Sequence, residues 1–430
     1  MASQVNPPRG MRDFLPGEKA RRESILGAIR ASYRAHGFAE IETPVAEDAQ
    51  RLHAGLGGDN EKLAFAIMRR GLTREDLAAA GSPLELADLG LRFDLTVPLA
   101  RFYASHRAEL PTPFRAIQIA PVWRAERPQK GRFRQFVQCD IDIIGEAGPL
   151  AEVELLTATA ATLRRLGVAG FTIRLNDRRL LTAMLDVFGF APEERDGVLI
   201  TVDKLDKAGV DGVVAELLER RSTPAAVDAL RSFLLRPQTR EHRPFGEGQI
   251  RAALPDGLES PVVAELAAIG DAVVAATGGE ESVVRYDPWL VRGMGYYTGA
   301  IFEVAHPDLG YSFGGGGRYD GMIGRFLGED VPAAGISLGF ERLVELVDLP
   351  GDDEQNAIAV VYDAAASPAV VVAARDRFVA EGRPVRLVRR PRQLAKALDA
   401  LAADGVAEFV LVDQGADPRA LVPRPLAFQE

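Results

Sequence analysis

The sequence contains few of the residues from which disulfides and structural metal sites are built. Its single cysteine, Cys139, cannot form a disulfide within the 430-residue chain. No pair of cysteines or histidines has the spacing of a zinc site; the histidines are His36, His53, His106, His242 and His306. We therefore expect neither a disulfide-stabilised fold nor a structural zinc, and we assign no metal-ligating residues.

Long apolar runs are also missing. The N-terminal stretch MASQVNPPRGMRDFLPGE lacks the apolar core of a signal peptide. The most apolar run, AIAVVYDAAASPAVVVAA, is interrupted by Asp363, Ser367 and Pro368, so it does not resemble a membrane span. We therefore expect a cytoplasmic protein without a membrane partner.

The chain has no excess of basic charge. Its 51 Lys and Arg stand against 61 Asp and Glu, for a net charge of -10. Any contact with nucleic acid must therefore come from a local basic patch. With 47% hydrophobic and 26% charged residues, the composition is that of a folded protein, and its length suffices for two or three domains.

Hydrophobic periodicity predicts a mixed order of helices and strands. We expect a helix over 18–36, a strand over 38–47, short strands and one helix between 91 and 145, a helix over 149–166, mainly charged helices over 177–255, strands within 283–306, and a helix over 335–347. Because proline cannot donate to a sheet ladder, Pro44 indicates an edge or interface position.

The last part of the chain has a different pattern. After an acidic stretch, strand-like segments over 357–362, 384–390 and 408–413 alternate with two helical ones. This alternation predicts a largely parallel sheet with helices on it, in a domain of its own. Ten Lys or Arg against nine Asp or Glu give residues 357–430 a net charge of +1, which makes them the least acidic part.

One segment, VWRAERPQKGRFRQFVQCDIDIIG at 122–145, is basic at one end and acidic at the other. If its second half is a strand, side chains alternate between faces. One polar face then carries Arg132, Arg134, Gln138, Asp140 and Asp142. The turn-rich RPQKG predicts a hairpin in which the preceding strand adds Arg124 and Glu126 to that face.

Such a face suits two ligands held end to end. Arginine grips phosphate oxygens in a planar fork, whereas carboxylates suit an ammonium group. A triphosphate and an amino acid bound in this way would place the carboxylate of the amino acid beside the phosphates, the arrangement that forms an acyl-adenylate. A salt-bridged solvent face and a nonspecific nucleic-acid patch are the alternatives that this segment alone leaves open.

Several segments together resemble a known family. The stretch WRAERPQKGRFRQF resembles motif 2 of class II aminoacyl-tRNA synthetases, in the form found in histidyl-tRNA synthetases. LVRGMGYYTGAIFE is similar to the histidine-specific motif of that family, GGGGRYDG to its second conserved piece, PAAGISLGFERL to its motif 3, RGMRDFLP to its opening and GFAEIETPVAE to its motif 1. The resemblance runs from Pro8 to about Leu349 in the family order, and more weakly beyond.

The resemblance implies roles for particular residues. Histidine would be bound by Asp94 and Thr96 at its amino group, by Gln138 and Asp142 in the pocket, by Tyr296 and Tyr297 over the ring, and by Arg124 and Arg292. ATP would be bound by Arg124, Glu126, Arg132 and Arg342. Arg124 and Arg292 would be the catalytic residues, acting on the α-phosphate with the help of Mg²⁺.

The same resemblance implies an α+β fold with an antiparallel sheet flanked by helices. A catalytic domain would comprise 1–176 and 256–349, interrupted by a mostly helical insertion at 177–255, and a linker at 350–356 would lead to an anticodon-binding-like α/β domain at 357–430. We expect a homodimer that activates L-histidine with ATP and transfers it to tRNA(His). The rival hypothesis is a non-catalytic, synthetase-like regulatory subunit of ATP phosphoribosyltransferase.

Two further features have simpler interpretations. Gly314 to Gly317 lack a following Lys-Ser or Lys-Thr, so we predict a tight turn with close backbone approach rather than a phosphate loop. Arg389, Arg390 and Arg392 would usually form a solvated loop, and they become phosphate contacts only if this domain meets RNA.

Overall fold

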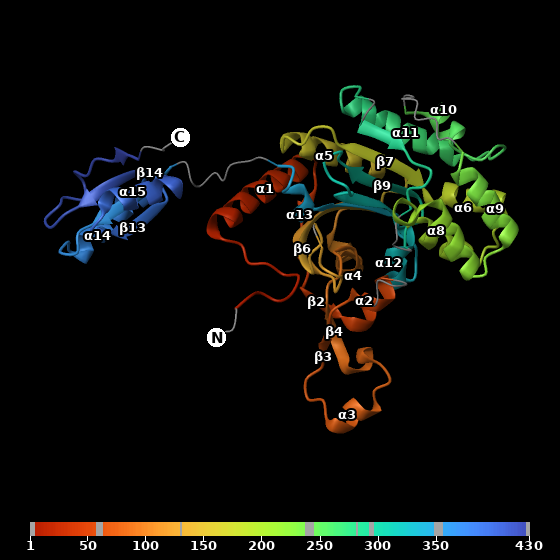
Figure 1. The fold of residues 1–430 in the computed structure, drawn as a ribbon, viewed down its shortest axis with the longest axis horizontal. Helices are drawn as coiled ribbons and strands as arrows, with labels where there is room; N and C mark the ends of the chain where they lie inside the picture. Colours follow the sequence, from red (N-terminus) through yellow and green to blue (C-terminus); the bar gives the residue numbers. More distant parts are fainter. Residues whose placement is uncertain are drawn as a thin grey trace. The chain divides into compact units, whose positions relative to one another are not determined.

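A computed structural model describes residues 5–56, 63–129, 131–236, 245–280, 283–291, 296–347 and 356–426. The chain forms two compact units (Figure 1): Met1–Asp13 with Leu26–Asp348, and Phe14–Ile25 with Leu349–Glu430. Within the ranges given, no helix is both long and apolar enough to cross a membrane.

An eight-stranded sheet forms the centre of the first unit, in the order β1-β5-β6-β11-β10-β9-β7-β8. The β1–β5 and β7–β8 pairs are parallel and the others antiparallel. The strands are β1 (Ala39–Glu40), β5 (Phe114–Trp123), β6 (Gln135–Ile144), β7 (Thr172–Asp177), β8 (Val284–Tyr286), β9 (Ala300–Ala305), β10 (Gly314–Arg318) and β11 (Ala333–Gly339). The predicted α+β fold with an antiparallel central sheet is therefore confirmed.

In the middle of β6, apolar and polar side chains alternate between the two faces of the sheet. Cys139, Ile141 and Ile143 are fully buried, and α5 (Leu150–Arg165) packs against β6 and β11. The other face of β6 carries polar side chains, and it is the face on which the candidate site lies. Other helices of the first unit are α4 (Thr96–His106), α11 (Val262–Ala276), α12 (Asp320–Leu327) and α13 (Phe340–Leu343), and α1 (Pro16–Ala35) belongs to this unit from Leu26 on.

The strand expected over 38–47 is wrong as a single element. The structure has β1 in the central sheet and a separate β2 (Ala46–Asp48), with Pro44 between them. Since proline has no backbone N–H to donate, the chain leaves one sheet before it joins the next. The second sheet has the order β2-β4-β3, with β3 (Ala66–Met68) and β4 (Ala87–Leu91), and α2 (Ala49–Leu56) and α3 (Arg74–Ala79) lie in the same region.

Two predictions around the glycine cluster need correction. Gly314 to Gly317 do not form a turn; they lie within β10, between β9 and β11. The expected close backbone approach is nevertheless present, because a Cβ at Gly316 would lie 1.9 Å from the Gly335 carbonyl oxygen. The helix expected over 335–347 is wrong in its first half, which forms β11, and only Phe340–Leu343 is helical as α13.

The segment after β7 is helical, as the periodicity predicted. It comprises α6 (Arg178–Phe188), α7 (Arg195–Val202), α8 (Leu205–Glu219), α9 (Pro224–Leu234) and α10 (Glu247–Ala252). The helices α6, α8 and α9 gather at one end of the first unit (Figure 1), where α8 and α6 each contact α9. The boundaries 1–176, 177–255 and 256–349 within this unit stay predictions.

The C-terminal part has the predicted β-α-β-α-β alternation. Strand β12 (Ala357–Tyr362) pairs in parallel with β13 (Val385–Arg389) and with β14 (Val406–Val412), and a short β15 (Arg424–Pro425) is antiparallel to β14. The helices α14 (Pro368–Ala380) and α15 (Leu394–Ala403) pack on this sheet. Residues 350–355 of the expected linker lie outside the described residues.

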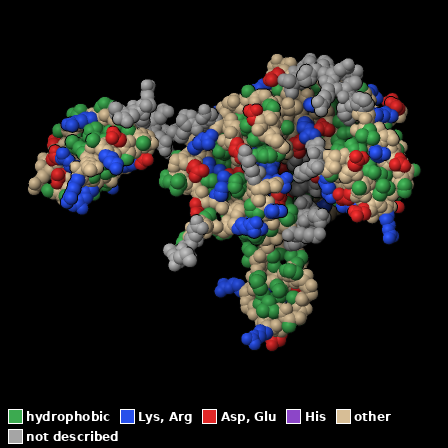
Figure 2. All heavy atoms as spheres, in the orientation of Figure 1, with side chains coloured by type: hydrophobic (Ala, Val, Ile, Leu, Met, Phe, Trp, Pro, Cys, Tyr) green, Lys and Arg blue, Asp and Glu red, His purple; other side chains and the backbone are tan. Residues whose placement is uncertain are grey.

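Basic and acidic side chains are interspersed on the visible face of the C-terminal sheet and its helices (Figure 2). Arg390 pairs with Asp413 at 3.0 Å and Arg386 with Asp404 at 3.2 Å, and both pairs are exposed. Exposed pairs of this kind contribute little to stability. For Arg390 the arrangement matches the solvated-loop interpretation and leaves an RNA contact untested.

Candidate active site

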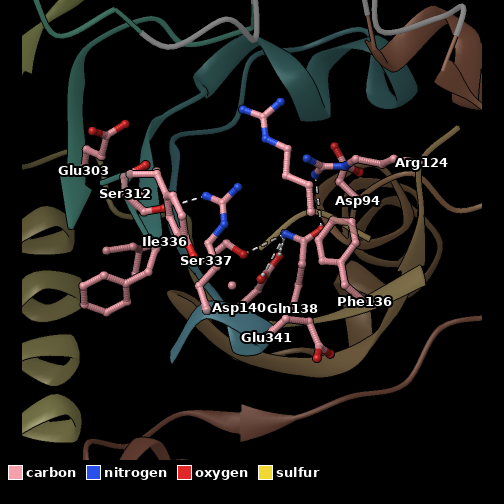
Figure 3. Close-up of a pocket in the computed structure, with 18 of the residues that line it drawn as sticks. Asp94, Arg124, Phe136, Gln138, Asp140, Glu303, Ser312, Ile336, Ser337 and Glu341 are labelled. Carbon is pink, nitrogen blue, oxygen red and sulfur yellow. Dashed lines mark hydrogen bonds between the residues drawn. The ribbon is translucent and has the colours of Figure 1, made fainter. Parts of the chain in front are cut away.

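A cavity of about 750 Å³ opens over the polar face of β6 and the adjoining β9, β10 and β11. Among the residues that line it are most of those predicted from the sequence: Asp94, Thr96, Arg124, Glu126, Arg132, Gln138, Asp142, Tyr296, Tyr297 and Arg342. Arg292, the remaining one, lies outside the described residues. Residues far apart in sequence thus meet in one cavity (Figure 3).

The Asp94 carboxylate carries an unsatisfied oxygen at the acidic end of the cavity. Asp94 lies just before α4 and is 2% exposed; its Oδ1 accepts a hydrogen bond from the Val97 amide at 3.1 Å. Its Oδ2 is buried and has no hydrogen-bond partner among the described residues. Burial raises the pKa of Asp94, while the Val97 amide and the Arg124 charge lower it. A ligand ammonium group would satisfy this oxygen.

Asp142, on the polar face of β6, is a second buried carboxylate that lines the cavity. It is 3% exposed, and its Oδ1 accepts a hydrogen bond from the Tyr319 hydroxyl at 2.6 Å. Burial raises the pKa of the Asp142 carboxyl to about 7, although the Tyr319 hydrogen bond opposes the shift. Gly335 faces Asp142 across the β6–β11 pair, and a Cβ there would lie 1.8 Å from Oδ1. Glycine is therefore required at 335.

Gln138 lies between the buried carboxylates of β6 and Arg124 (Figure 3). Its Nε2 donates to Ser337 Oγ at 2.7 Å, and its Oε1 accepts from Arg124 Nη2 at 3.4 Å. Asp140 lies between Gln138 and Asp142 in the strand, on the same face. Burial, with repulsion from Asp142, raises the pKa of Asp140 well above its usual value.

The charge of Arg124 acts on two of these carboxylates, those of Asp94 and Asp140. Its Nε donates to the Phe93 carbonyl at 3.1 Å, and the guanidinium lies 4.4 Å from the Phe93 ring centroid and 5.1 Å from that of Phe136. Burial lowers the pKa of Arg124, and the charges of Asp94 and Glu126 oppose this. An arginine held in this way stays charged and presents a fixed fork to an anion.

Two more arginines lie at the basic end. Arg132 Nη1 is 3.4 Å from Glu126 Oε2. Arg342 donates from Nε to the Gly131 carbonyl at 3.1 Å and from Nη1 to the Ser312 carbonyl at 2.5 Å. Burial and the neighbouring Arg132 charge lower the pKa of Arg342. The concentration of positive charge favours an anionic ligand here.

The predicted hairpin needs one correction. β6 begins at Gln135, so the strand alternation does not extend to Arg132 and Arg134, and the connection 124–134 is longer than a tight turn. Arg132 still lines the cavity. Arg134 does not line it: its Nε donates to the Glu126 carbonyl at 3.0 Å and so braces the connection.

Aromatic side chains form the wall beside Asp142. The Tyr296 and Tyr297 ring centroids are 4.7 Å apart, and Tyr319 meets Tyr296 edge-on at 6.1 Å. Burial raises the pKa of Tyr296 well above its usual value, so the hydroxyl stays protonated. A flat heterocycle with hydrogen-bonding nitrogens suits such a wall.

Sequence reasoning missed Tyr319 and Ser337 as site residues, and it placed Asp140 on the polar face without giving it a role. Asp140 could have been assigned because it shares the strand face with Gln138 and Asp142. Tyr319 lies two residues after the glycine cluster, within the GGGGRYDG stretch that the motif resemblance already included. Ser337 gave no signal, because its segment was expected to be helical.

Comparisons with known proteins agree with this geometry. A family model described as histidyl-tRNA synthetase matches residues 10–343. The histidine–tRNA ligase of Leifsonia xyli subsp. xyli is 57% identical over 99% of each chain. The crystal structure of the Nostoc sp. PCC 7120 histidyl-tRNA synthetase has a TM-score of 0.73 at 26% identity, over 98% of this chain and 97% of that one.

A second solved structure shows the fold alone. It is described as an ATP phosphoribosyltransferase regulatory subunit/histidyl-tRNA synthetase from Bacillus halodurans, and it has a TM-score of 0.74 at 21% identity. The alignment covers 96% of this chain and 99% of that one.

Proposed function

This chain belongs to the histidyl-tRNA synthetase family, and from that premise we propose that it is a histidine–tRNA ligase. It joins L-histidine to ATP, releases pyrophosphate, and passes the histidine to the 3′ end of tRNA(His). The observation that carries the proposal is the polarity of one cavity, in which the buried carboxylates of Asp94 and Asp142 face the arginines at positions 124, 132 and 342.

Histidine would occupy the acidic end. Its ammonium group fits Oδ2 of Asp94, which has no hydrogen-bond partner in the described part of the chain, beside Thr96. Its ring would lie between the Tyr296–Tyr297 wall and the polar floor formed by Gln138 and Asp142. This arrangement is supported by chemistry, since a histidine that loses water on binding needs charged or hydrogen-bonding partners for both ends.

ATP would occupy the basic end, on Arg124, Glu126, Arg132 and Arg342. We assign Arg124 to both ligands, because its guanidinium lies between the carboxylate floor and the other two arginines and can grip the histidine carboxylate and the α-phosphate. The motif resemblance adds Arg292 as a second catalytic arginine beside the α-phosphate.

The chemistry requires no general base. The histidine carboxylate is already ionised at neutral pH, and its oxygen attacks the α-phosphorus while the bond to pyrophosphate breaks. The protein must bring two anions together and balance the charge that develops at phosphorus, which positioned arginines do. Arg124 acts here as an electrostatic clamp whose own proton does not move.

Mg²⁺ fits the basic end of the cavity, where the Glu126 carboxylate lies beside Arg132. The described residues contain no group of three or more His, Cys, Asp or Glu that could hold a metal ion. Mg²⁺ usually binds through one or two carboxylates together with substrate phosphates. Glu126, which lines the cavity, would be that protein ligand. When bound, the ion neutralises phosphate charge.

The rival hypothesis, a regulatory subunit that senses histidine, is less well supported. Full-length identity of 57% to a histidine–tRNA ligase favours the enzyme. The cavity also favours the enzyme. A protein that only senses histidine needs the carboxylates that bind histidine, but it does not need Arg132 and Arg342, which we assign to ATP.

The remaining assignments extend the proposal to the whole protein. The enzyme would act in the cytoplasm as a homodimer, with Pro44 near the subunit interface, as motif 1 of the family suggests. The C-terminal sheet and its helices would contact tRNA, since this part of the chain is the least acidic.

The test is histidine-dependent exchange of labelled pyrophosphate into ATP, without tRNA. We expect exchange with histidine and Mg²⁺ and none with other amino acids. Histidine binding without exchange above background would instead favour the regulatory subunit.

A further inference from the structure

Residues 8–13 fasten the connection between β5 and β6. The Gly10 carbonyl accepts a hydrogen bond from the Arg134 amide at 2.8 Å. Gly10 has a φ of +82°, and a Cβ there would lie 2.8 Å from Pro128 Cγ and 2.9 Å from Arg134 Cγ. The segment is therefore packed tightly against the connection, in a backbone conformation that favours glycine.

Arg12 contacts two residues that line the cavity, Phe133 and Glu341. Its guanidinium lies 3.5 Å from the ring centroid of Phe133, which lines the cavity. Its Nη2 pairs with the Glu341 Oε2. Arg12 itself does not line the cavity. It therefore acts on the site only through the residues that it contacts.

Glu341 connects these contacts to the nucleotide end. Its side chain is 6% exposed, and its Oε1 accepts from the Val137 amide at 3.3 Å. Glu341 thereby joins α13 to β6, and the next residue of α13 is Arg342, which reaches back to the Gly131 carbonyl. Loss of the Arg12 charge would weaken the contacts that hold this buried carboxylate, and Glu341 and Arg342 are neighbours on α13.

We propose that Arg12 is a positioning residue for ATP. It holds Glu341, and with it Arg342, on one side, and Phe133 of the 124–134 connection on the other. Arg12 thereby fixes the position of the 124–134 connection relative to α13, although the two are more than 200 residues apart in sequence. The histidine end has its own supports at Tyr319 and Ser337. This inference rests on the proposed function.

The experiment compares Arg12→Ala and Arg12→Lys with the wild type in pyrophosphate exchange, with calorimetric titration of ATP and of histidine. For Arg12→Ala we expect the KM and Kd of ATP to rise about tenfold or more, as expected when a charged hydrogen bond is lost. The values for histidine should change by less than about twofold. Arg12→Lys should recover part of the loss, because an ammonium group keeps the charge but lacks the fork.

Matched controls separate positioning from general damage. Arg9→Ala removes an exposed arginine of the same segment and should leave both KM values unchanged. Gly10→Ala should weaken ATP binding, whereas Gly37→Ala, with a similar φ of +85° and no atom within 4 Å of its Cβ, should not.

The outcomes are distinguishable. If the wild type shows no histidine-dependent exchange, the proposed function fails. If the wild type is active and Arg12→Ala raises the KM of both ligands equally, or lowers only the active fraction, Arg12 is merely structural and the inference is wrong. Unchanged ATP affinity in Arg12→Ala also overturns it.

Discussion

Asp142→Asn should make the ligand-free protein more stable while weakening its binding of histidine. The substitution keeps the size of the side chain and leaves an oxygen to accept the Tyr319 hydroxyl, while it removes the charge and replaces the second oxygen with an NH2 group. Stability and affinity therefore move in opposite directions, which a merely misfolded variant would not do.

The stability change follows from the raised pKa. Asp142 has a pKa of about 7 in the folded chain against an ordinary value of 3.8. The folded state thus binds the proton more tightly, and its stability falls as the pH rises from about 4 to about 7. Three pKa units at about 1.4 kcal/mol each give an upper bound on the order of 4 kcal/mol for the gain in Asp142→Asn at pH 8.

The affinity change has the opposite sign. A buried contact that loses its charge should cost about 1 to 3 kcal/mol, which raises the Kd for histidine roughly 5- to 150-fold at pH 8. In the wild type, protonation of Asp142 should weaken binding about tenfold between pH 8 and pH 6, and the variant should lack this dependence. Free histidine titrates alike in both experiments, so the ratio of the two Kd values isolates Asp142.

The assay is calorimetric titration of histidine and, separately, of ATP at pH 6, 7 and 8, with urea unfolding of both proteins. ATP affinity should barely change, because its proposed contacts are Arg124, Glu126, Arg132 and Arg342. Collapse of ATP binding with intact histidine binding would mean that the polarity of the cavity is reversed. An unchanged histidine Kd together with an unchanged pH profile would refute the role of Asp142.

Two further predictions concern the floor of the cavity and the C-terminal unit. Gly335→Ala should abolish measurable histidine binding, because its Cβ would lie 1.8 Å from the Asp142 Oδ1; histidine titration checks this, and wild-type affinity would contradict the geometry. Deletion from about Gln355 onward should spare histidine adenylation, since the described cavity residues lie within Leu26–Asp348, but should impair tRNA charging. Full charging efficiency with an unchanged salt dependence would exclude the C-terminal unit as an RNA contact.

Local patterns sufficed for much of the fold and for most site residues. The alternation of Gln138, Asp140 and Asp142 with Cys139 and Ile141 requires only the two-residue period of a strand, so the sequence determined which side chains share a face. The same holds for the C-terminal alternation of strands and helices. The resemblance of local motifs to those of a known family implied the residues from Asp94 to Arg342 that line the cavity.

Only the tertiary structure decided the features that depend on contacts between residues far apart in the sequence. Glycine has weak intrinsic preferences, so Gly314 to Gly317 became a strand only because β9 and β11 lie on either side. The segment 335–347 divided into β11 and α13 because pairing with β6 overrode its helical periodicity. The fold brings remote side chains together and removes water from them. This sets the pKa of Asp142, leaves Asp94 Oδ2 without a partner among the residues described, and forms the Arg12–Glu341 pair. No local spacing in the sequence encodes that burial.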